Sequence, residues 1–179
     1  MDLFPERVSN MTVKTQNSLA FAVSTVLFFA AIFFQTSNIT DISIKTATPL
    51  IVLSLLTAFA QVHSFKASAV AGFITGAFFD SVASNCFCFN TIAFLLVGVL
   101  VNAAANNLFN KNLLSAGVLA LLASGSYWVC YWAVFHIIGR NMTDVITYLL
   151  KYAFPSAIYT AVFVFPFYFI YKALDSTKN

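Results

Sequence analysis

Six long apolar stretches, separated by short polar breaks, run along this chain of 179 residues. The stretches cover approximately residues 18–36, 47–62, 67–84, 91–109, 113–138 and 153–171. Each is close to the ~20 residues that an α-helix needs to cross a ~30 Å hydrocarbon core, with the second short and the fifth long enough to tilt. They lack the alternation of roughly ten-residue barrel strands. The pattern therefore predicts six transmembrane helices.

Composition supports the same class of protein. Hydrophobic residues make up 60% of the chain, with 21 phenylalanines, whereas charged residues make up only 8%. A soluble domain of this size cannot hide so much apolar surface, because its exterior must remain polar. We expect an all-α integral membrane protein with one six-helix membrane domain, residues 18–172. The first apolar stretch is expected to act as an uncleaved signal anchor.

The short segments outside the membrane domain indicate its orientation. Residues 1–17 form an N-terminal segment, 173–179 a C-terminal tail, and the longest connection is 139–152. With a cytoplasmic N-terminus, the cytoplasmic side holds six cations: Arg7, Lys14, Lys66, Lys111, Lys172 and Lys178. The outer side holds three: Lys45, Arg140 and Lys151. Positive charge favours the cytoplasm, so both termini are expected there. The cations are scattered, which gives no reason to expect a nucleic-acid partner.

Asp80 is the leading candidate for a functional side chain. It is an ionisable residue in an apolar run, which costs roughly 2.5–3.5 kcal/mol on insertion scales and usually marks a functional or assembly site. Gly72, Gly76 and Asp80 recur every four residues, so they share one helix stripe with a drift of only about 40° per step. Small residues let helices approach closely in lipid. We expect a packing or partner interface, with Asp80 bonded to Asn90, Asn85 or a backbone amide.

Two further helices have polar or proline residues at informative positions. Asn102 and Asn106 lie one turn apart on one face of the fourth stretch, as interhelical hydrogen bonds require. Pro155 is expected in the first turn of the sixth helix. Pro166 is interior and predicts a kink, because it removes the bond to the Val162 carbonyl.

Aromatic residues cluster in the outer half of the fifth stretch. Tyr127 and Tyr131, and likewise Trp128 and Trp132, are four residues apart. Their position near a predicted helix end indicates an interfacial aromatic belt.

The sequence shows no catalytic or metal-binding constellation. An aspartic membrane protease needs two carboxylates in one site, but only Asp80 lies within an apolar stretch. Ser126 and His136 are ten residues apart on one helix, or about 15 Å along its axis, too far for a nucleophile and its base. The three cysteines lack the four-ligand spacing of structural zinc. No enzyme activity, cofactor or metal is predicted.

Several short motifs, in order and spacing, resemble the rod shape-determining protein MreD family over about residues 30–172. The residues that carry the resemblance are Gln35-Thr36-Ser37, Pro49, Gly72-Phe73-x-x-Gly76-x-x-x-Asp80, and Pro166 with Lys172. The block in the third stretch is the most specific. Leu50 and the turn at 84–88 depart from the pattern usual in that family.

The resemblance implies a non-catalytic component of the bacterial cell-elongation machinery in the cytoplasmic membrane. Its partner would be MreC, and through the complex it would connect MreB filaments with the RodA glycosyltransferase and its class B transpeptidase. The implied fold is similar to the substrate-binding S components of energy-coupling-factor vitamin transporters. That relation supplies the alternative, a vitamin-binding subunit using Asp80, Asn85, Asn90 and the aromatic belt. The outer halves of the helices offer few convergent polar groups for such a pocket.

Overall fold

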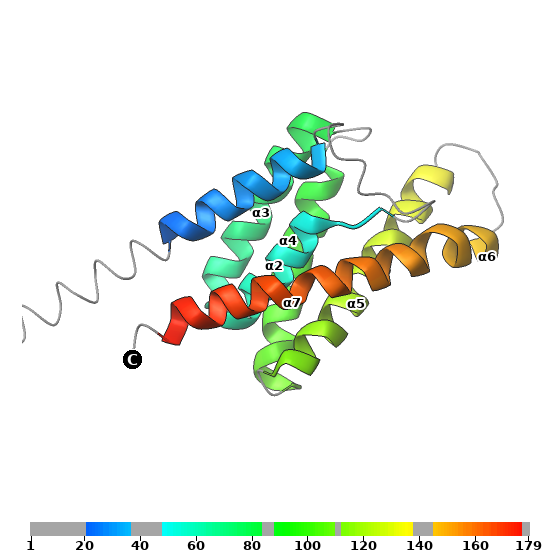
Figure 1. Ribbon diagram of the computed structural model, residues 1–179. Helices are drawn as coiled ribbons and strands as arrows, with labels where there is room; N and C mark the ends of the chain where they lie inside the picture. The colour runs from blue at the N-terminus through cyan, green and yellow to red at the C-terminus, as the bar shows by residue number, and fades with distance from the viewer. Residues whose placement is uncertain (1–20, 37–47, 84–87, 110–111, 138–144, 177–179) are drawn as a thin grey trace, which may run out of the picture.

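The computed structural model describes residues 21–36, 48–83, 88–109, 112–137 and 145–176, and this part of the chain is helical without any strand (Figure 1). Its elements are an N-terminal helix (Phe21–Thr36), α2 (Ile51–Val62), α3 (Phe65–Ala83), α4 (Phe89–Asn107), α5 (Leu113–Trp132), the π-helical turn η1 (Ala133–Ile137), α6 (Val145–Tyr148), the π-helical turn η2 (Leu149–Ala153) and α7 (Phe154–Ser176). The prediction of an all-α protein is confirmed.

Within the part of the chain that the structure describes, three helices are long and apolar enough to cross a membrane. They are Phe89–Asn107, Leu113–Phe135 and Ile146–Leu174, while Phe21–Thr36 and Ile51–Val62 are apolar but shorter. The last of the three, with 29 residues, has a length of about 43 Å and exceeds a ~30 Å core, so it must tilt or project beyond it. The count of six membrane spans stays a prediction.

The prediction of a loop at 139–152 is wrong for its second half, which is helical. The chain is helical from Val145 through η2 into α7. Pro155 is therefore inside a continuous helical run and not in its first turn. Immediately before it, the N–H of Phe154 bonds to the carbonyl of Leu149, five residues back. A wide π-type turn gives space to the proline ring, which in a regular turn would collide with the carbonyl four residues earlier.

Pro166 lies inside α7, which remains helical on both sides of it. Residues 138–144 and the turn at 84–87, which contains Asn85, lie outside the described residues.

The short helix α2 forms the centre of the bundle. It packs against α3, α4, α5 and α7, and Phe59 on α2 meets the ring of Phe28 on the N-terminal helix at 5.7 Å between centroids. All ten residues from Val52 to Gln61 are buried. The burial includes the polar residues Ser54, Thr57 and Gln61, so α2 is enclosed on every side by the rest of the bundle.

Candidate functional site

The carboxylate of Asp80 caps the N-terminus of the neighbouring helix α4. Its Oδ1 accepts the backbone N–H of Asn90 at 3.0 Å and the side-chain amide of Asn90 at 2.9 Å. Its Oδ2 accepts the backbone N–H of Thr91 at 2.8 Å and the Thr91 hydroxyl at 2.6 Å. Both oxygens act only as acceptors, which is the role of an ionised carboxylate. The two backbone donors belong to the first turn of α4, where N–H groups have no partner within the helix.

The local sequence explains why the cap comes from another helix. The residue at the N-cap position of α4 is Cys88, whose side chain makes no capping hydrogen bond. Cys88 also has a φ of 64°, a left-handed conformation that differs from the extended backbone usual for a capping residue. Asp80 supplies the missing acceptor from α3, and its negative charge faces the positive end of the α4 dipole.

A third helix joins this network through Asn90. The Tyr127 hydroxyl on α5 donates to Asn90 Oδ1 at 2.7 Å. Tyr127 is only 5% exposed, and its ring lies 5.8 Å from Phe89 and 5.9 Å from Phe94. The prediction of a membrane-interface position is therefore wrong for Tyr127, which lies within the bundle and links α5 to the Asp80 cap.

Close packing of α3 and α4 brings Asp80 to its partners. A Cβ added to Gly76 would lie 2.5 Å from the Thr91 Cα, and one added to Gly72 would overlap the Phe94 carbonyl. From the other side, a Cβ on Gly98 of α4 would lie 2.5 Å from the Ser68 carbonyl oxygen. No side chain fits in these contacts. The structure thus places the predicted glycine stripe against α4, and it adds Gly98 as the reciprocal residue.

Asn102 caps the C-terminus of α2, as Asp80 caps the N-terminus of α4. Its side-chain amide donates to the carbonyls of Ala60 at 2.6 Å and His63 at 2.8 Å. These carbonyls lie in the last turn of α2 and its cap, where acceptors lack helical partners. Asn106 donates to Asn102 Oδ1 at 3.1 Å and so orients the amide. The pairing of the two asparagines along one face agrees with the sequence interpretation.

The N-terminus of α2 is satisfied by two other helices. Gln35, near the end of the N-terminal helix, accepts the Val52 N–H through Oε1 at 3.0 Å. On α7, Thr160 Oγ1 accepts the Leu50 N–H at 3.0 Å, and Ser156 Oγ accepts the Thr48 N–H at 3.2 Å. Leu50 is the N-cap residue of α2 and has no capping side chain of its own.

These contacts follow from the length of α2. Its 12 residues extend about 18 Å, well short of a ~30 Å hydrocarbon core. Leu50 at its beginning and Gln61 near its end are buried in the bundle, where unpaired backbone groups cost several kcal/mol each. Side chains from three other helices remove that cost.

Sequence reasoning found some of these groups and missed others. It singled out Gly72, Gly76, Asp80, Asn102 and Asn106, and it named Asn90 as one of three candidate partners of Asp80, beside Asn85 and a backbone amide. It missed the capping roles of Gln35, Thr91, Ser156 and Thr160. A signal was present, because Ser156 and Thr160 are four residues apart and therefore share a helix face.

The polar side chains singled out in the sequence make structural hydrogen bonds. Among the described residues there is no group of three His, Cys, Asp or Glu side chains that could hold a metal ion. Asp80 is occupied by four donors from α4, and the Ser126 hydroxyl donates to the Ala123 carbonyl of its own helix.

Comparison with known proteins agrees with this architecture. Searches of curated proteins and of solved structures found no match. The family model described as rod shape-determining protein MreD matches residues 15–175, nearly the whole chain. The match includes the Gly72-to-Asp80 stripe, the Gln35 cap and the asparagines of α4. The chain therefore belongs to the MreD family, whose members are membrane-associated structural proteins that determine rod shape.

Proposed function

We propose that this protein is a non-catalytic membrane scaffold of the bacterial rod complex. It binds MreC directly and, through that complex, connects MreB filaments with peptidoglycan synthesis by RodA and its class B transpeptidase. It lies in the cytoplasmic membrane with six spans and both termini in the cytoplasm. Membership of the family supports the role in rod shape. The finer assignments are our proposal.

The observation that carries the proposal is how the interior polar side chains are used. Asp80, Asn102, Gln35 and Thr160 all bond to helix ends within the bundle. The surface, by contrast, exposes large apolar side chains on several helices, including Phe33, Phe73, Leu122, Val162 and Phe169. A protein built in this way offers helix faces to other membrane proteins.

The alternative of a vitamin-binding transporter subunit has less support. A small-molecule pocket needs several convergent polar groups. Asp80, Asn90 and Tyr127, which the alternative would use, are bonded to one another or to α4. No solved structure supports the similarity to S components.

Affinity purification of the tagged full chain in mild detergent, followed by mass spectrometry, tests the proposal. We expect MreC among the retained proteins. Recovery of an ATPase pair with a transmembrane coupling subunit, and no MreC, would instead support the transporter alternative.

A photo-crosslinker scan then locates the contact. Single crosslinking residues are placed at exposed positions on different helices, such as Phe33, Phe73, Leu122 and Phe169. A specific interface gives MreC crosslinks from one face. Equal yields from every face would indicate random collision and would contradict direct binding.

A further inference from the structure

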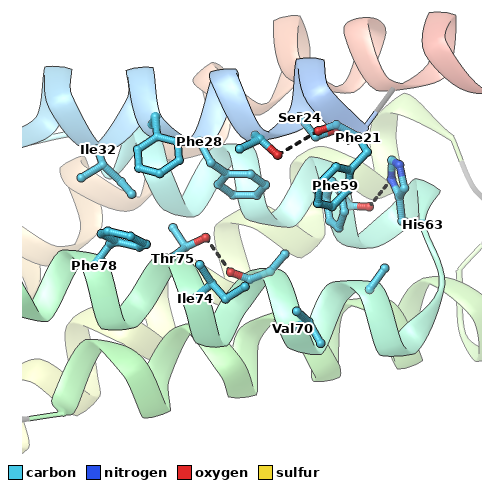
Figure 2. Close-up of a pocket in the computed structure, with 14 residues that line it drawn as sticks. Phe21, Ser24, Phe28, Ile32, Phe59, His63, Val70, Ile74, Thr75 and Phe78 are labelled. Carbon is cyan, nitrogen blue, oxygen red and sulfur yellow. Dashed lines mark hydrogen bonds between the residues drawn. The ribbon is translucent and has the colours of Figure 1, made fainter. Parts of the chain in front are cut away.

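An apolar groove of about 380 Å³ lies between the N-terminal helix and α3, with Phe59 and His63 of α2 at its floor. Figure 2 shows Phe28 and Ile32 on the N-terminal helix facing Thr75 and Phe78 on α3 across this space. The groove is distinct from the capping network, since none of Asp80, Asn90, Asn102 or Gln35 lines it.

The walls favour an apolar occupant. Four phenylalanines of the N-terminal helix and α3 line them, together with aliphatic side chains. The hydroxyl of Thr25 donates to the Phe21 carbonyl at 2.9 Å, and that of Thr75 to the carbonyl of Ala71. Because these hydroxyls are bonded within their own helices, the two threonine side chains offer a ligand methyl groups more readily than hydrogen-bond donors.

The depth of the groove matches one leaflet of a bilayer. On α3 the lining residues run from Ala67 to Phe78, a distance of roughly 16 Å along the helix. This is about half of a ~30 Å hydrocarbon core. An acyl chain that enters from the Ala67 end therefore reaches the full length of the groove without leaving its own leaflet.

A positive charge marks the end at which the headgroup would lie. Lys66 is exposed and directly precedes Ala67 at the end of the groove. The ring of His63, which also lines this end of the groove, lies 5.6 Å from that of Tyr171 on α7. Asp80, on the same helix α3, lies 14 residues from Lys66, or about 21 Å along the axis. Charge complementarity at this end favours an anionic headgroup.

We propose that the groove binds one acyl chain of an anionic phospholipid, with the headgroup phosphate at Lys66. The rings of Phe29 and Phe78 already meet across the two helices at 5.4 Å between centroids, and the bound acyl chain adds dispersion contacts along the rest of the groove. This inference does not depend on the proposed binding of MreC.

The test uses the full chain in nanodiscs that contain phosphatidylglycerol with a photoreactive group on one acyl chain. Labelled peptides are identified by mass spectrometry, and the same experiment is repeated with photoreactive phosphatidylcholine. We expect labelling to concentrate on residues of the groove, with phosphatidylglycerol preferred. Equal labelling of the groove and the outer helix faces would mean ordinary surrounding lipid only, and would overturn the proposal.

Two pairs of variants sharpen the result. Ala71→Phe fills the groove and should reduce labelling of the groove residues to the level of the outer helix faces. Its control is Ala77→Phe, at a half-buried position of α3 that does not line the groove, and it should leave labelling of the groove unchanged. Lys66→Gln should reduce the preference for phosphatidylglycerol about fivefold, the factor expected for one lysine at an anionic surface. Lys151→Gln, on the exposed surface of η2, is its control.

Size-exclusion profiles and thermal melting establish that each variant is folded. Unchanged groove labelling in folded Ala71→Phe would contradict the proposal. So would crosslinks, in native membranes, from groove residues to a transmembrane helix of another protein in place of lipid.

Discussion

Replacement of Asp80 tests whether one side chain holds the end of α4. In Asp80→Leu, the backbone N–H groups of Asn90 and Thr91 lose their acceptor, the first in a buried and the second in a half-buried position. An unsatisfied buried donor costs about 1–3 kcal/mol, and the half-buried Thr91 donor about 1 kcal/mol, so together they predict a loss of about 2–4 kcal/mol in the free energy of unfolding. At about 2–4 °C per kcal/mol for a chain of this size, the melting temperature should fall by roughly 10 °C.

Asp80→Asn distinguishes the carboxylate from a simple polar residue. The amide keeps one oxygen acceptor but replaces the other with a donor, and it loses the negative charge that faces the α4 dipole. We therefore expect Asp80→Asn to lower the free energy of unfolding by about 1–2 kcal/mol, because one acceptor is lost. Its stability then lies between those of wild type and Asp80→Leu. Rescue of rod shape in cells should follow the same order.

The assay is thermal unfolding of the purified protein in one detergent, with cell width measured in parallel. Ser81→Ala is the control, because the Ser81 hydroxyl is exposed and bonds only to the Ala77 carbonyl of its own helix. Its effect should stay within about 0.5 kcal/mol. The capping argument fails if Asp80→Leu has the melting temperature of wild type. It also fails if Asp80→Asn lowers the melting temperature as much as Asp80→Leu does.

Three further predictions concern packing, the second cap and topology. Gly76→Leu should separate α3 from α4 and lower both the melting temperature and the protein level. The control is Gly125→Leu, because an added Cβ at Gly125 has nothing within 4 Å, and it should lower neither. Equal effects of the two variants would contradict tight packing of α3 on α4. Asn102→Ala leaves the Ala60 and His63 carbonyls without their donor and should lower the free energy of unfolding by about 2–4 kcal/mol. The control Asn107→Ala, at an exposed position, should change it by almost nothing. Similar melting temperatures for the two variants would reject the cap. A reporter fused after Asp175 should be active only in the cytoplasm, and activity on the outer side would refute the proposed orientation.

The helical class and several site residues could be predicted because lipid allows few solutions. Apolar stretches of sufficient length must be helices in a membrane. A carboxylate such as Asp80 in such a stretch must find donors, and Asn90 is among the nearest polar residues in sequence. The close approach at Gly72 and Gly76 was predicted from their four-residue spacing together with Asp80 on the same stripe.

The remaining features depend on which helices are neighbours, and the sequence does not contain that directly. Tyr127 was interpreted as facing the membrane interface, because lipid and protein core are equally apolar and the aromatic pattern is the same for both. The helical run from Val145 was missed, since Lys151 and the nearby charges resemble a loop. The role of Gln35 could not be derived until the short helix α2 was known to begin beside the end of the N-terminal helix.

The capping contacts also explain how an apolar bundle selects one arrangement of its helices. Inside a membrane there is little hydrophobic drive to prefer one neighbour over another. A helix end with unpaired backbone groups does have a preference, because only a neighbour with the right side chain at the right depth removes the cost. Asp80 thereby pairs α3 with α4, Asn102 pairs α4 with α2, and Gln35 pairs the N-terminal helix with α2. With these polar groups already in use, a transmembrane partner is to be recognised on the outer surface of the bundle by shape and packing, at exposed apolar faces such as those of Leu122 and Phe169.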